Sequence, residues 1–156
     1  MGCDAHMYVE MVTDGKWQYV NPPFNEKCLG EDRDEEWGRE YYDRHKYDSA
    51  VFGSPEMRWN FWQCYYAFAL LAGVRNRWDV VPLAPKRGIP FDVSPEVKVI
   101  ADNENDWSHS HTHFTLEELR TLRGKDGNID ALINVLDQNK GDHKDSDVRV
   151  IVWFDS

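Results

Sequence analysis

The stretch from Ser54 to Asn76 constrains the fold most, because it predicts one helix that is apolar on nearly every side. Ser54 can cap its start, Pro55 suits the first helical position, and Gly73 comes near its end. Large aromatic side chains recur at three- and four-residue steps on both sides of this helix. A helix of this kind must be buried, so we expect the rest of the chain to pack around it. The polar residues within it and the short uninterrupted apolar run argue against a membrane span.

Length and charge limit which class of protein the chain can belong to. The chain has 156 residues, of which 29% are charged, and this suits one globular domain with its own core. Its 18 basic and 28 acidic residues give a net charge of −10. This charge disfavours direct nucleic-acid binding and fits a basic partner, such as a nucleic-acid-handling protein, although acidity that only aids solubility is equally compatible. Three widely spaced cysteines and the lack of an apolar leader predict a reducing, cytosolic environment.

Two regions have the periodicity of strands. Residues 3–12 alternate, and their apolar members share the face that we expect to meet the core: Ala5, Met7, Val9 and Met11. Asp14-Gly15 is a hairpin turn signal, so residues 16–20 should form the returning strand. Residues 148–155 are apolar on both faces, which predicts a strand in the centre of the sheet.

Two further helices are predicted after the central one. Thr115 and Glu118 form a capping box, so a helix should run from residue 116 to about 123. Apolar residues recur at helical spacing from Ile129 to Leu136. Residues 78–95 contain four prolines and predict an ordered loop, and residues 97–107 look loop-like or weakly extended. The chain is thus predicted to be α+β, a single domain over residues 1–156 with a small, mostly antiparallel sheet packed around a buried aromatic helix.

Histidines supply the most specific chemical feature. His109, His111 and His113 alternate with small polar residues, so in an extended chain all three imidazoles should point the same way. Asp4 and His6 form a second polar pair on the predicted first strand. Ligands converging from these two segments could hold a divalent metal, zinc or manganese. Acid–base or anion-binding histidines without a metal, and purely structural histidines, remain open alternatives, and no catalytic residue is assigned.

Arginines and cysteines give weaker signals. Arg75, after the central helix, and Arg87, in the proline-rich loop, are candidates for binding phosphate, although lone arginines usually face solvent or pair with acids. By strand alternation Cys3 points away from His6, and Cys64 falls within the central helix. We therefore expect both thiols to be buried packing groups.

An acidic segment at residues 31–48 holds eight acids, four bases and interleaved aromatic residues, namely Trp37, Tyr41, Tyr42 and Tyr47. It predicts either an exposed helix over about 34–47 or an irregular excursion. A solvated surface is the plainer interpretation. A partner-binding surface is the sharper one, because tyrosine and tryptophan are favoured anchors at interfaces.

Several motifs, in order along about half of the chain, resemble an uncharacterised family that bacteriophage genomes encode. They are MGCD-x-H at the N-terminus (residues 1–6), LAGVRN (71–76), RGIP with SPEV (87–90 and 94–97), and HSH with TLEEL (109–111 and 115–119). The chain departs from the family pattern at His113 and Phe114, and it carries residues 31–56 as an acidic aromatic insertion. The resemblance implies a phage origin and expression inside a bacterial cell, and it implies no particular reaction.

Two functions follow. The leading one is a phage accessory protein in the host cytosol, which serves anti-defence or host takeover by binding a host protein through residues 31–48. The alternative is a small metal-dependent hydrolase acting on a nucleotide or another phosphate-containing small molecule, with Asp4 and the histidines holding the metal.

Overall fold

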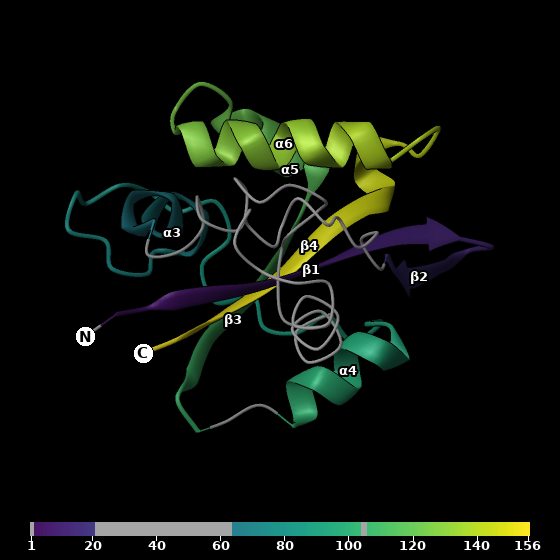
Figure 1. Cartoon of the computed structure of the whole chain (residues 1–156), viewed down its shortest axis with the longest axis horizontal. Coiled ribbons are helices and arrows are strands. Elements are labelled where there is room, and N and C mark those ends of the chain that lie inside the picture. The colour runs from purple at the N-terminus through teal and green to yellow at the C-terminus, as the bar shows by residue number, and fades with distance from the viewer. Residues whose placement is uncertain (1, 21–63, 104–105) are drawn as a thin grey trace, which may run out of the picture.

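The computed structural model describes residues 2–20, 64–103 and 106–156. The strands in this part of the chain form one antiparallel sheet, in the order β2 (Lys16–Tyr19), β1 (Asp4–Thr13), β4 (Val148–Asp155) and β3 (Ser108–Thr115). One face of the sheet is covered by α3 (Tyr65–Ala72), α5 (Leu116–Leu119) and α6 (Gly127–Asn139), and the other by α4 (Pro95–Asp102) (Figure 1). The chain is therefore α+β, with an antiparallel sheet against a buried aromatic helix, as predicted.

β1 and β2 form the predicted hairpin. Asp14 and Gly15 at its turn have φ values of 53° and 75°, the left-handed conformation that a tight hairpin requires. The strands then pair from Thr13 opposite Lys16 to Glu10 opposite Tyr19. The apolar face of β1 packs into the larger core, as its alternation predicts.

β4 lies at the centre of the sheet, because it pairs with β1 on one side and with β3 on the other. This confirms the prediction from its two apolar faces. Phe154 belongs to the larger core with α3, whereas Ile151 and Trp153 belong to a smaller core under α4. Both faces of β4 are apolar because helices cover both.

α3 falls within the predicted central helix, of which residues 54–63 lie outside the described part of the chain. Phe68 is fully buried, and its ring meets that of Phe154 edge-on at 5.1 Å between centroids. Gly73 ends the helix at a φ of 75°, a left-handed conformation that glycine adopts without strain, as predicted. No helix in the described residues has the length and apolar character needed to cross a bilayer.

α5 begins at the predicted capping box, with Thr115 and Glu118 each bonded to the backbone of the other. A 3-10 turn at Arg120–Leu122 continues it, so the helical segment ends close to the predicted position. α6 begins after Asp126, whose side chain accepts from the first backbone N–H groups of the helix.

α4 corrects one prediction, because residues 97–107 were expected to be loop-like and the helix extends to Asp102. Ser94 caps its start, and its side chain accepts from the backbone N–H of Val97. The helix is short and mixed in composition, so its stability comes from packing rather than from propensity. Val97 is fully buried against Tyr8 and Trp153 on the second face of the sheet.

A buried ion pair fixes α4 on that face. Arg149 of β4 donates to Glu10 of β1, with its Nη2 2.6 Å from Glu10 Oε1. The other carboxylate oxygen of Glu10 accepts from the backbone N–H of Ser94 at 2.7 Å. Arg149 also donates to Asp92 at 2.8 Å and lies over the ring of Trp17, with its Cζ 4.1 Å from the ring centroid. The loop before α4 is thereby held by two strands.

Candidate functional site at one end of the sheet

The two chain termini lie at the same end of the sheet (Figure 1). There Asp4, at the start of β1, is opposite Asp155, at the end of β4, and Asp155 is opposite Ser108 on the other side. We call the polar group at this end the sheet-end site; its members are Cys3, Asp4, His6, Arg75, His109, His111 and Asp155. The antiparallel register brings these residues together from opposite ends of the chain.

His6 and Asp155 form the best-defined pair in the site. His6 Nε2 lies 2.9 Å from Asp155 Oδ2, and the two side chains are 27% and 29% exposed. An ionised carboxylate only accepts hydrogen bonds, so this contact requires the proton on Nε2. In the neutral imidazole Nδ1 is then the acceptor. The pair therefore has the chemistry of a base oriented by an acid, and it is open to solvent.

Trp153 joins His6 to the histidine stretch. The imidazole of His6 stacks on the indole at 6.4 Å between centroids and 23° between planes. His111 of β3 stacks on the same indole at 5.7 Å and 29°. Since β4 lies between β1 and β3, the three rings form a row across one face of the sheet.

His109 lies on the opposite face, where its ring stacks on Phe154 at 6.3 Å and 28°. The prediction that all three imidazoles point the same way is therefore wrong. The register of β3 shifts between His109 and Thr112, and Ser110 there has a φ of 57°. Such a bulge adds one residue to the strand, so each side chain before it points to the opposite face of the sheet from the one that simple alternation predicts. His109 contacts two hydroxyls, Ser110 Oγ at 2.9 Å and Ser156 Oγ at 3.1 Å.

His113 and Arg87 lie further along β3 and hold the proline-rich loop. His113 Nδ1 donates to the carbonyl of Gly88 at 2.9 Å. Arg87 donates to both carboxylate oxygens of Glu118, at 2.9 and 2.7 Å, and to the carbonyl of His113 at 3.2 Å. The hydrogen bond from Arg87 lowers the pKa of Glu118. These contacts give both residues a structural role, and the phosphate-binding role of Arg87 stays a prediction.

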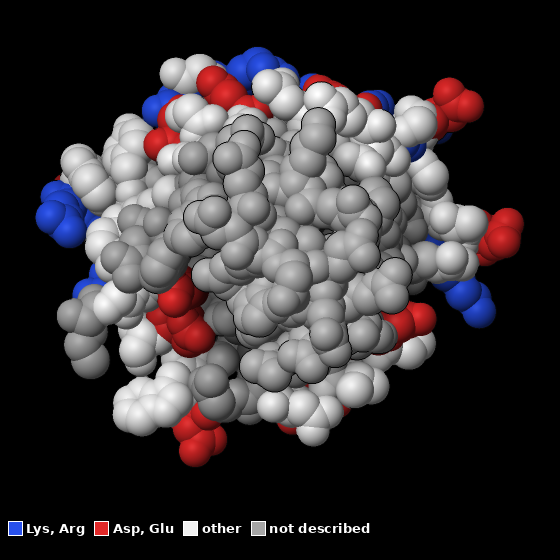
Figure 2. All heavy atoms as spheres, in the orientation of Figure 1, with Lys and Arg blue, Asp and Glu red and all other residues white. Residues whose placement is uncertain are grey.

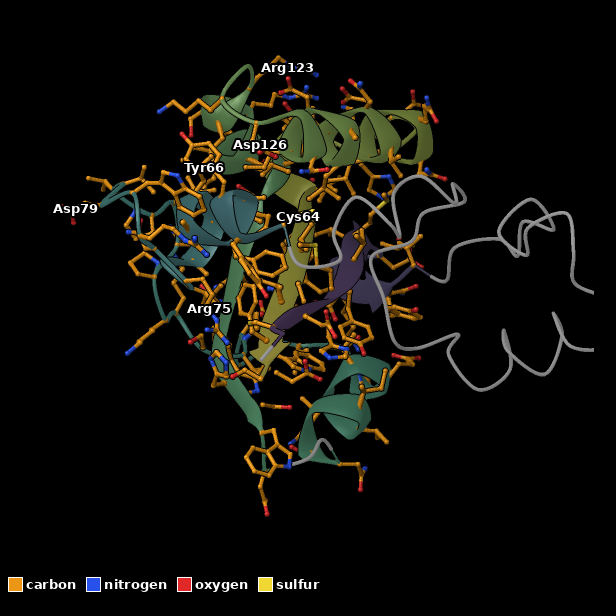
Figure 3. The ribbon with its side chains drawn as sticks, turned by 60° about the vertical axis from the view of Figure 1, so that its left-hand side comes forward. Cys64, Tyr66, Arg75, Asp79, Arg123 and Asp126 are labelled. Atoms are coloured by element: carbon orange, nitrogen blue, oxygen red, sulfur yellow. The ribbon has the colours of Figure 1, made fainter. Side chains whose placement is uncertain are left out.

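Arg75 brings a positive charge to this end of the sheet on the face opposite His6, where it hydrogen-bonds Cys3. Arg75 follows α3 (Figure 3) and has a φ of 55°. Its Cζ lies 5.7 Å from the ring centroid of Tyr65. Burial raises the pKa of the Cys3 thiol, and the hydrogen bond and charge of Arg75 oppose that rise. The thiol is therefore protonated at neutral pH, as suits the packing role predicted for Cys3.

The predicted metal ligands are only partly brought together. Asp4, His6 and His111 lie near one end of one face, His109 lies across the sheet, and His113 is bonded elsewhere. In the described residues no three His, Cys, Asp or Glu side chains form a group able to hold a metal ion. Zinc or manganese binding thus stays a prediction. The partner-binding candidates Trp37, Tyr41, Tyr42 and Tyr47 lie outside the described part of the chain.

Asp155 and Trp153, which the last strand contributes to the site, were not among the residues predicted from the sequence. Both lie in a segment whose apolar character pointed to the core. One signal was available, because a central antiparallel strand must end beside the start of its neighbour. An acidic residue at that end is thereby placed near Asp4 and His6.

No protein-family model matches this chain, and no curated protein or solved structure is similar enough to count as a match. The likeness to a phage family stays a resemblance based on short motifs. The function must therefore be inferred from the side chains themselves.

Proposed function

We propose that the chain is a phage-encoded hydrolase that acts in the host cytosol on a nucleotide or another phosphate-containing small molecule. The observation that carries this proposal is the His6–Asp155 pair, with Arg75 at the same end of the sheet on its other face. A base, its orienting acid and a cation are the groups that hydrolysis of a phosphate ester uses.

His6 is the proposed general base. Its bond to Asp155 fixes the imidazole orientation and leaves Nδ1 to take a proton from an attacking water molecule. The indole of Trp153 supports the ring on one face. His111, which stacks on the same indole as His6, is the candidate for the proton donor to the leaving group. A positioned base of this kind accelerates a reaction by about 10²–10⁴-fold.

Arg75 is the proposed phosphate-binding group. Its guanidinium can donate to two phosphate oxygens and neutralise part of their charge. Asp4 and Asp155 oppose an anionic substrate, so a divalent ion beside Asp4 and His6 would help. Manganese accepts such carboxylate and imidazole ligands, and metals at phosphate sites are often held by few protein ligands together with the substrate.

The test is phosphate release from nucleoside phosphates and sugar phosphates, with manganese, with zinc or with a chelator. Asp155→Asn and His6→Gln should each lower kcat/KM by about 10²-fold or more. Asp102→Asn is the matched control, because Asp102 is 61% exposed on α4 and pairs only with Lys98 among the contacts described for it. Equal rates in the wild type and His6→Gln would contradict the proposal.

A second candidate function is the one that sequence analysis favoured, the binding of a basic host protein. Large apolar side chains are exposed around α4, with Phe91 at 100%, Val99 at 61% and Trp107 at 69%. The sequence from Phe91 to Trp107 holds five acids and one lysine. Figure 2, in the orientation of Figure 1, shows acidic and basic side chains of the described residues interspersed around the rim of this face. Exposed apolar side chains surrounded by acidic residues are suited to binding a basic partner.

Deletion of residues 31–48 separates the two functions. Loss of host-protein capture, with hydrolysis and melting temperature retained, supports binding through that segment. Capture that survives the deletion and is lost in Phe91→Ser would assign the partner to the α4 side instead. Capture should also weaken as salt rises, because electrostatic steering is screened over about 8–10 Å at physiological ionic strength.

A further inference from the structure

A cavity of about 330 Å³ lies between the start of α3, the loop that follows α3, and the start of α6. Figure 3 shows Cys64 and Tyr66 of the α3 segment below Asp126, which precedes α6. Its volume is at the lower end of the range for small-molecule sites, about 300–1,000 Å³. The described residues that line it are all distinct from those of the sheet-end site.

One wall of the cavity is aromatic. Tyr66 and Trp78 meet edge-on, with 5.1 Å between ring centroids and 73° between planes. Trp78 is 45% exposed, so the part of its ring that Arg77 and Tyr66 do not cover is open to a ligand. A half-exposed indole held by a second ring is a suitable surface for a planar heterocycle.

The lining of the cavity contains groups of opposite charge, Arg77 and Asp126. Arg77 lies over the indole of Trp78, with its Cζ 5.4 Å from the ring centroid. Asp126 is held rigidly, because its Oδ1 accepts from the backbone N–H groups of Asn128 at 2.8 Å and Ile129 at 3.2 Å. Its carboxylate retains further acceptor capacity, and the side chain of Asn128 adds an amide.

We propose that this cavity binds a mononucleotide. The base lies against Tyr66 and Trp78, an exocyclic amine of the base donates to Asp126, and the phosphate pairs with Arg77. A ligand with a planar ring, a hydrogen-bond donor and an anionic group matches all three features of the wall. This site is separate from the proposed hydrolase site, so neither proposal depends on the other.

The test is calorimetric titration of the full chain with AMP, adenosine and ribose 5-phosphate. AMP should bind more tightly than either fragment, because it alone has both ring and phosphate. Trp78→Ala should weaken AMP binding by about 5- to 150-fold, the range that one base–aromatic stack supplies. Trp107→Ala, a change at another exposed tryptophan, should leave the affinity unchanged. Arg77→Gln should weaken AMP and leave adenosine unaffected.

Trp78→Phe keeps an aromatic ring and should retain most of the affinity, which separates a stacking role from a folding defect. The proposal is overturned if AMP does not bind the wild type at millimolar concentration, or if Trp78→Ala binds AMP as well as the wild type does. Loss of AMP binding in Arg75→Gln with no change in Trp78→Ala would also overturn it. That last pattern would place the nucleotide at the sheet-end site and support the hydrolase proposal instead.

Discussion

Replacing Arg149 with methionine should lower the free energy of unfolding by about 3–5 kcal/mol, because it leaves the charge of Glu10 buried without its cation. The side chains of Arg149 and Glu10 are 6% and 0% exposed. Glu10 Oε1 accepts from both Nε and Nη2 of Arg149, at 2.8 and 2.6 Å. After the substitution, the backbone N–H of Ser94 is the described donor that still bonds the Glu10 carboxylate.

The size of the effect follows from what the guanidinium contacts. Besides Glu10 it donates to Asp92 and lies over Trp17, and a desolvated cation–π contact contributes up to about 2 kcal/mol. In a chain of this length each kcal/mol shifts Tm by about 2–4 °C, so Tm should fall by about 6–20 °C. Urea unfolding, followed by circular dichroism, gives the free energy directly. Amide exchange in α4 should also become faster, since the ion pair fixes its N-terminus.

A matched control and a double variant sharpen the test. Lys98→Met breaks an ion pair whose side chains are both 61% exposed, so it should cost less than about 1 kcal/mol. Combining Arg149→Met with Glu10→Leu removes both charges and should recover most of the loss. A loss below about 1 kcal/mol in Arg149→Met, at unchanged urea dependence, would refute the reasoning.

Three further predictions use the same protein. Phe68→Ala should destabilise by about 3–5 kcal/mol in urea, because Phe68 is fully buried against Phe154; a loss below about 1 kcal/mol would mean the core repacks. The fold lowers the pKa of Glu118, so its pairing with Arg87 stabilises the folded state above the ordinary pKa of 4.5, and this stabilisation is lost as pH falls through the lowered pKa. Glu118→Gln should therefore make the free energy of unfolding depend less on pH in the acid range. Burial raises the pKa of Cys64 to about 11, so alkylation at pH 8, measured peptide by peptide, should be about 100-fold slower than after unfolding.

Local signals in the sequence predicted much of the fold. The turn at Asp14-Gly15, the capping box at Thr115 and the glycine at the end of α3 each determine the backbone within a few residues. The two apolar faces of residues 148–155 predicted a central strand, because only a strand covered on both sides can bury both. These features depend on the neighbouring residues, which a single sequence contains.

The features that were missed depend on contacts between distant residues. α4 was missed although Val97, Ile100 and Ala101 recur at helical spacing; the sheet residues that bury them, Tyr8 and Trp153, are distant in the sequence. The bulge at Ser110 moves His109 to the other face, and strand alternation assumes that no residue is inserted. Asp155 became a site residue only through its register with Asp4. The histidines could therefore be predicted as candidates from the sequence, whereas their arrangement depends on how the strands of the sheet pair.

The central claim is that the sheet-end site handles phosphate, and titration with inorganic phosphate, followed through the imidazole NMR signals, tests it most directly. The signal of His6 should shift saturably, and Arg75→Gln should abolish the shift. His143 is the internal control, because its ring bonds the carbonyls of Val12 and Lys140, away from the site. A His6 signal that does not move at millimolar phosphate, or one that moves only as much as that of His143, would contradict the account.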